Sequence, residues 1–246
     1  MAQRIKGILF DLGNTLLDFG RVDIPSLFEA GARLAYEHLQ SLGCRVPPFA
    51  KYHHRQLWAV RWNVFKSRIA RREFNSLELI VRQARRMGFS LTRQQALEEA
   101  WLWYKPLSQC SSKEEGLVEL LEEFQRLGLL LGLVSNTFIP GEVLDRHLEA
   151  EGLLDLLSVR VYSCQVRYRK PHPKIFAAAL DRCRLRADET LFVGDSLKAD
   201  VYGANRAGMI SVLKDPGGAR RRSGISPRHR IRALAELPAL VSRYSG

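Results

Sequence analysis

The strongest constraint on the fold is a series of short apolar runs, each followed by polar residues at its carboxyl end. The first run covers Ile5–Phe10 and ends at Asp11. Similar runs are expected to form strands at Leu129–Val134, Val159–Tyr162, Thr190–Val193 and Ile210–Leu213. Short Val, Leu and Ile runs that alternate with helices are typical of a parallel sheet with helices on both faces. We therefore expect an α/β protein with a Rossmann-like, doubly wound parallel sheet.

The stretch between the first and second strands has no comparable apolar run and reads as helical throughout. The expected helices are Ser26–Ser41, one that starts after Pro48 and runs through Trp58 and Trp62, Ser76–Met87, and Thr92–Tyr104. This order predicts a core domain at 1–19 and 107–246 and an inserted α-helical cap domain at 20–106. Ligands of doubly wound sheets bind at the carboxyl ends of the strands. An insert that leaves the first strand at that end is expected to cover the site as a lid.

The second half of the chain supplies the remaining elements of the core. Its helices are expected at Lys113–Leu127, Glu142–Glu151, Pro173–Cys183 and Lys198–Ala207. An edge strand is expected near Ile231 and a last helix from about Glu236.

Polar side chains follow four of the expected strands. Asp11 follows the first, Ser135 and Asn136 the second, Lys170 the third, and Asp195 with Asp200 the fourth. Because the carboxyl ends of parallel strands meet at one edge of a sheet, we expect these residues to converge. Carboxylates are the ligands that Mg²⁺ prefers, and it binds them together with substrate phosphate. Lysine and short-loop amides neutralise phosphoryl oxygens.

Four motifs, in order, resemble those of the haloacid dehalogenase-like superfamily. They are FDLGNT at Phe10–Thr15, VSN at Val134–Asn136, RKPHP at Arg169–Pro173 and FVGDSLKAD at Phe192–Asp200. Each lies after an expected strand, and VYGANRAGM continues the last motif through Met209. The resemblance covers the core, and the insert has the position and helical character of the family's small α-helical cap.

The resemblance implies a magnesium-dependent phosphohydrolase that acts on a small phosphorylated metabolite. In such an enzyme Asp11 attacks phosphorus and forms an aspartyl-phosphate, which water then cleaves. Asp11, the main-chain carbonyl of Gly13 and Asp195 would hold Mg²⁺. Asp200 would bind the metal through water or orient Lys170. An anionic nucleophile needs such a cation in order to approach an anionic substrate.

The resemblance also implies how the phosphoryl group is held. Ser135 and the main-chain amide of Asn136 would bind its oxygens. Lys170 would offset the negative charge of Asp11 and of the phosphate.

Gly13 departs from the pattern of most family phosphatases, which have a second aspartate at this position. That aspartate protonates the leaving group and then activates water, and general acid–base catalysis is typically worth about 10²–10⁴ in rate. Three outcomes are open. The substrate has a leaving group that needs little protonation, such as an acyl phosphate or a sugar 1-phosphate. Another group, with Asp18 or a cap histidine as candidates, supplies the proton. Or the chain is a weakly active or non-catalytic relative.

Two other functions remain as alternatives. Metal-independent haloacid dehalogenases of the same superfamily do not need the acidic pair of the fourth motif, so Asp195 and Asp200 argue against that activity. A binding protein that senses a phosphorylated ligand would use the same pocket without turnover.

The cap is expected to supply substrate specificity. His54, Trp58 and Arg61 have the spacing of one helix face and could contact a phosphorylated or aromatic substrate. The competing interpretation, which we favour, is that the tryptophans pack the cap's own core. These are Trp58, Trp62, Trp101 and Trp103.

Charge and cysteine content bear on partners and location. The formal net charge is +12, which favours anionic partners such as phosphorylated metabolites. The basic residues are spread along the chain, so we expect neither nucleic acid nor a membrane as a partner. The four cysteines form no CxxC pair, which fits free thiols in a reducing cytoplasm. A monomer or homodimer is expected.

Overall fold

The structure of the chain is a computed structural model that describes residues 4–70, 72–218 and 224–244. These residues form two compact units. The core unit comprises the described residues up to Asp18, Ser112–Asn136, and those from Leu148 onward. The helical unit comprises Phe19–Ser111 and Thr137–His147.

The core unit is built on a six-stranded parallel sheet with strand order β3-β2-β1-β4-β5-β6. The strands are β1 (Gly7–Phe10), β2 (Leu130–Ser135), β3 (Val159–Tyr162), β4 (Thr190–Gly194), β5 (Ile210–Lys214) and β6 (His229–Ile231). Strand β1 is fully buried and pairs with β2 and β4, so that Phe10 lies opposite Leu133 on one side and Val193 on the other. The first strand of the chain is therefore central, and Asp11 follows it between the ends of two neighbours.

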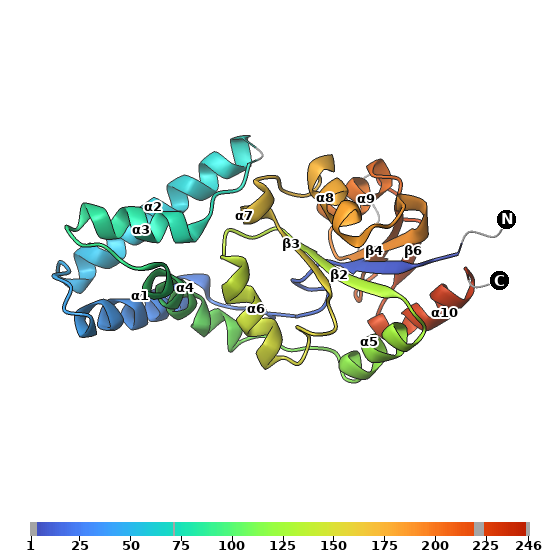
Figure 1. Cartoon of the computed structure of the whole chain (residues 1–246), viewed down its shortest axis with the longest axis horizontal. Helices are drawn as coiled ribbons and strands as arrows, with labels where there is room; N and C mark the ends of the chain where they lie inside the picture. The colour runs from blue at the N-terminus through green and yellow to red at the C-terminus, as the bar shows by residue number, and fades with distance from the viewer. Residues whose placement is uncertain (1–3, 71, 219–223, 245–246) are drawn as a thin grey trace. The chain divides into compact units, whose positions relative to one another are not determined.

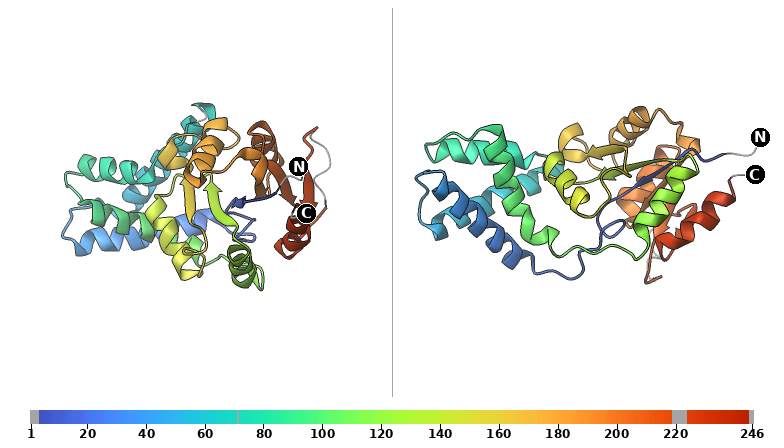
Figure 2. Two further views of the ribbon diagram at one scale, coloured as in Figure 1. Left: turned by 45° about the vertical axis from the view of Figure 1, so that its right-hand side comes forward. Right: turned by 60° about the horizontal axis from the view of Figure 1, so that its bottom comes forward.

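Helices cover both faces of this sheet, as Figures 1 and 2 show. The helices of the second half are α5 (Leu117–Arg126), α6 (Gly141–Ala150), α7 (Ser163–Val166), α8 (Pro173–Cys183), α9 (Tyr202–Arg206) and α10 (Leu237–Ser242). Helices α8 and α9 lie on one face, and α5 and α10 on the other. The α8 side chains Ile175 and Phe176 pack on Leu9, Val134 and Phe192 of the strands. The predicted doubly wound α/β fold is confirmed.

Several elements of the core differ from the expected boundaries. Helix α5 begins at Leu117 because Gly116 before it has a left-handed backbone (φ 71°). The expected helix Lys198–Ala207 is a π-helical turn at Leu197–Val201 that continues into α9. Helix α7 has only four residues, too few to give a periodic pattern in the sequence.

The helical unit contains α1 (Ile24–Ser41), α2 (Phe49–Ala70), α3 (Ser76–Arg86) and α4 (Arg93–Ser108). Thr92 caps α4 in a capping box with Gln95. Helices α1 and α4 approach closely at Gly31, where a Cβ would lie 2.5 Å from the carbonyl oxygen of Trp103. Only glycine permits that contact.

The helical unit also takes in Thr137–His147, a segment that the sequence-based division placed in the core. Phe138 stacks on Phe74, with ring centroids 4.9 Å apart, and its carbonyl accepts a hydrogen bond from Ser76 N at 2.8 Å. Arg146 pairs with Glu98 at 2.9 Å and lies over the Trp101 ring. These contacts come from distant parts of the chain and leave no local signal. The division into a core and a cap domain at 19/20 and 106/107 stays a prediction, and α4 continues past the second boundary to Ser108.

Helix α2 has several large apolar side chains that are exposed. Trp58, Trp62, Phe65 and Ile69 are 54–69% exposed, whereas Ser67 is buried and bonds to Glu73. The interpretation that all four tryptophans pack the core of the cap is therefore wrong for Trp58 and Trp62. Trp103 does pack in that core, against Tyr52 and Ala32. Tyr52 and Phe49 of α2 pack in the core of the unit, whereas its two indoles do not.

None of the helices in the part of the chain that the structure describes is long and apolar enough to cross a membrane.

Candidate active site

The residues expected to carry the chemistry converge at the carboxyl ends of β1, β2 and β4 and after β3, all within the core unit. Asp11 directly follows β1, and its main-chain N donates to the Val193 carbonyl at 2.9 Å. Ligand oxygens of Asp11, Asp195 and Asp200 lie within 4.8 Å of one another. Residues almost two hundred positions apart in the chain thus form one acidic cluster.

Lys170 lies at the centre of this cluster, with its side chain 1% exposed. Its ammonium donates to Asp11 Oδ1 at 2.5 Å and to the Val134 carbonyl at 2.8 Å, and it pairs with Asp200 Oδ1 at 2.8 Å. The ammonium thus makes two hydrogen bonds and one further ion pair. Lys170 is therefore held as a fixed positive charge.

Asn136 fixes the backbone of Lys170. Its side-chain oxygen accepts from Lys170 N at 2.7 Å, and its side-chain amide donates to the Lys170 carbonyl at 3.1 Å. Sequence analysis gives a role only to the main chain of Asn136 and does not predict these side-chain contacts with Lys170. Ser135, at the end of β2, is buried next to it.

Asp200 reaches the cluster from the π-helical turn after β4. Its Oδ2 accepts from Ser196 N at 2.9 Å, while its Oδ1 pairs with Lys170. A Cβ at Gly194 would lie 2.4 Å from the Asp200 carboxyl carbon, so the glycine allows this close approach. Asp200 thus accepts a hydrogen bond through Oδ2 and forms an ion pair with Lys170 through Oδ1.

Asn14 is a second residue that the sequence interpretation missed. Its backbone is left-handed (φ 56°), a conformation that asparagine tolerates better than most residues. Its side-chain amide donates to Asp195 Oδ2 at 3.4 Å, a long hydrogen bond between two motifs. The only signal in the sequence is an asparagine in a tight loop after a strand.

Electrostatics at the cluster favour a cation. Burial, together with Asp200 and Asp195, raises the pKa of Asp11 to about 7 even though Lys170 lowers it. Burial alone would lower the pKa of Lys170, but Asp11 and Asp200 more than offset this effect and raise it. The cluster brings three carboxyl groups close to one another and to the Lys170 ammonium, so their ionised forms repel each other. A divalent cation would balance them.

The residues proposed for specificity lie in the helical unit. His54 and Trp58 line one groove, with ring centroids 6.3 Å apart. Arg61 is exposed and is not among the residues that line that groove. Their role in specificity stays a prediction.

Comparison with known proteins identifies the family. The profile of the haloacid dehalogenase-like hydrolases matches residues 5–208. The chain belongs to this family, and its curated relatives identify it as a phosphatase.

One relative is a ribulose-1,5-bisphosphate 5-phosphatase of Halopiger xanaduensis, 30% identical over 96% of this chain and 98% of its own. Another is an N-acylneuraminate-9-phosphatase of Rattus norvegicus, 23% identical over 97% of this chain and 94% of its own.

Solved structures show the same architecture. A HAD phosphatase from Thermococcus onnurineus is 26% identical, with a TM-score of 0.60 over 96% of this chain and 98% of its own. A 2-haloacid dehalogenase from Pseudomonas syringae pv. Tomato DC3000 has a TM-score of 0.70 over 98% of this chain and 99% of its own. Its identity is 22%, so this second likeness concerns the fold alone.

Proposed function

We propose that the chain is a magnesium-dependent phosphohydrolase of small phosphorylated metabolites, and that it works through an aspartyl-phosphate on Asp11. The observation that carries the proposal is the position of Asp11 at the end of the central strand, bonded to Lys170 and within ligand distance of Asp195. Two relatives are named for phosphatase activity on phosphorylated sugars or sugar acids. A sugar phosphate is therefore the substrate class that we favour.

The donor set fits Mg²⁺. Magnesium prefers oxygen ligands and is commonly held by one or two carboxylates plus substrate phosphate. Asp11, Asp195 and the Gly13 carbonyl would hold it. The ion pair of Asp200 with Lys170 and its hydrogen bond from Ser196 N favour a role for Asp200 in orienting Lys170. When bound, the metal would neutralise charge between the carboxylates and the phosphate.

Each protein group then has a separate role in the reaction. The free oxygen of Asp11 attacks phosphorus, the bond from phosphorus to the leaving oxygen breaks, and water later attacks the aspartyl-phosphate and releases phosphate. Ser135 and the Asn136 main chain bind phosphoryl oxygens. Lys170 keeps Asp11 ionised and in place, since it lowers the pKa of that carboxyl.

The experiment that tests this proposal is phosphate release from a panel of sugar phosphates with and without Mg²⁺. We expect hydrolysis that EDTA abolishes and that added Mg²⁺ restores, because a cation would offset the repulsion between the clustered carboxylates and the anionic substrate. Ca²⁺ serves as a control, since it prefers more ligands at longer distances. Full activity in EDTA would remove the metal from the mechanism.

Gly13 makes a separate prediction about the leaving group. Gly13→Asp places a carboxyl group at the position where most family phosphatases have their proton donor. We expect faster hydrolysis of alkyl phosphates by about tenfold or more, because their leaving alkoxide needs a proton. Acetyl phosphate, whose leaving group is already a weak base, should change little.

The ratio of these two rates is the measurement. An equal change for alkyl and acyl phosphates would show that the new carboxyl does not act as the proton donor. No change for either would mean that another group already supplies the proton.

A further inference from the structure

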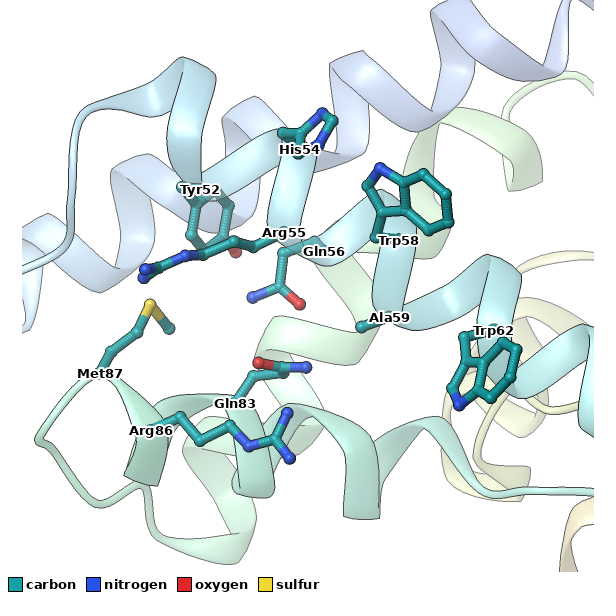
Figure 3. Close-up of a pocket in the computed structure, with 10 residues that line it drawn as sticks. All are labelled: Tyr52, His54, Arg55, Gln56, Trp58, Ala59, Trp62, Gln83, Arg86 and Met87. Carbon is teal, nitrogen blue, oxygen red and sulfur yellow. The ribbon is translucent and has the colours of Figure 1, made fainter.

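A groove lies between α2 and α3, wholly within the helical unit (Figure 3). Its volume is about 720 Å³, within the range of roughly 300–1,000 Å³ that is usual for small-ligand pockets. Helix α2 contributes Trp58 and Trp62, whose rings are more than half exposed. Large aromatic side chains left open to solvent on one helix face commonly mark a binding surface.

Side-chain amides and guanidinium groups line this groove. Figure 3 shows the side-chain amides of Gln56 and Gln83 facing each other across it, with the Arg86 guanidinium beside Gln83. Arg55 extends along the groove toward Met87. The two arginines are exposed, and no acidic side chain is among the described residues that line the groove.

The surrounding charge has the same sign. Helix α2 has five Lys and Arg residues and no Asp or Glu. Helix α3 adds Arg82, Arg85 and Arg86 against Glu78 alone. A groove with this charge attracts an anion and repels a second α2 helix, so pairing of two copies through it is disfavoured.

Beneath the groove lies a small cavity that shares Tyr52, Gln56 and Met87 with it. Glu99 lines this cavity, is 1% exposed, and has one carboxyl oxygen without a hydrogen-bond partner. Burial, and to a lesser degree Glu98, raise the pKa of Glu99 to about 8. Glu99 is therefore mostly protonated at neutral pH, so it does not cancel the positive charge above it.

We propose that this groove binds an organic anion with a flat ring, of the nucleotide type, with the ring against Trp62 and the anionic group at Arg86, whose guanidinium extends toward that end of the groove. A planar ring stacks on an indole, and a guanidinium binds phosphate or carboxylate with two parallel hydrogen bonds. The two glutamine amides are placed to bond polar edges of the ring. The inference goes beyond the proposed function, since this binding would not use Asp11.

The chain offers a direct readout, because all four tryptophans lie in the helical unit. The full-length Asp11→Asn variant, which prevents turnover, would be titrated with AMP while tryptophan fluorescence is followed. We expect a saturable change, and about tenfold weaker binding of adenosine and of inorganic phosphate than of AMP.

Charge variants assign the site. Arg86→Gln should weaken AMP binding by about tenfold or more, as expected for loss of a charge-assisted contact. Arg82→Gln is the matched control, since it removes the same charge from α3 outside the groove and should change the affinity by less than about twofold.

Three results would overturn the inference. They are no saturable signal at millimolar AMP, phosphate binding as tight as AMP binding, or an equal loss for Arg82→Gln and Arg86→Gln. None of these results would contradict the metal-dependent hydrolysis proposed for the core unit.

Discussion

Asp11→Asn should abolish phosphate release, with a fall in kcat of about 10⁴-fold or more, because an amide cannot form the acyl phosphate intermediate. The change keeps the shape of the side chain and an oxygen that can accept from Lys170. Lys170 also keeps Asp200 and the Val134 carbonyl as partners. Phosphate release from a sugar phosphate, measured beside the wild type, gives the result.

Two further measurements make the test specific to the nucleophile. Urea unfolding should show a variant that remains folded, and acid-quenched wild type should carry a phosphoryl group on the peptide that contains Asp11. A variant that loses turnover but still binds the substrate is expected of an enzyme. Hydrolysis within about tenfold of the wild type would show that Asp11 is not the nucleophile.

Lys170→Met should damage both stability and activity. The substitution leaves Asp11 and Asp200 close together without the buried ammonium, and loss of one partner of a buried ion pair typically costs about 3–5 kcal/mol. Urea unfolding of the metal-free protein at pH 7 measures this change.

The activity of this variant should also depend on pH in a defined direction. Lys170 lowers the pKa of Asp11, so without it that pKa rises above its present value of about 7. Less Asp11 is then ionised at neutral pH, and activity should rise as the pH is raised beyond the range in which the wild type has levelled off. An unchanged pH profile would contradict the role of Lys170 in tuning Asp11.

The double variant Lys170→Met/Asp200→Asn is the control for the two effects. Removing one of the two uncompensated charges should recover much of the stability, since Asp200 is almost fully buried. Activity should stay low, because the positive charge next to Asp11 is still missing. Recovery of both properties together would mean that Lys170 acts only on stability.

The parallel sheet with its alternating helices, and the convergence of Asp11, Lys170, Asp195 and Asp200, could be predicted from the sequence. Each of these residues follows a short apolar run, and the rule for parallel sheets places such positions at one edge. The bonds that hold them could not be predicted in the same way. The Val134 carbonyl and the side chain of Asn136 contact Lys170 only when the loops come together in the folded chain.

The orientation of α2 was beyond sequence reasoning for a different reason. Apolar side chains are normally expected to face the core, so Trp58 and Trp62 were assigned inward. In the structure Tyr52 and Phe49 are the α2 side chains that pack in the core with Trp103, while Trp58 and Trp62 are more than half exposed. The apolar pattern of α2 alone therefore does not predict which of its side chains face the core.

The grouping of Thr137–His147 with the helical unit has a practical consequence for engineering. The chain passes between the two units four times, after Asp18, Ser111, Asn136 and His147, whereas a simple insertion passes twice. A chimaera that transplants only the contiguous insert would separate Phe138 from Phe74 and Arg146 from Glu98. Exchange of this module between relatives should succeed only when both pieces travel together.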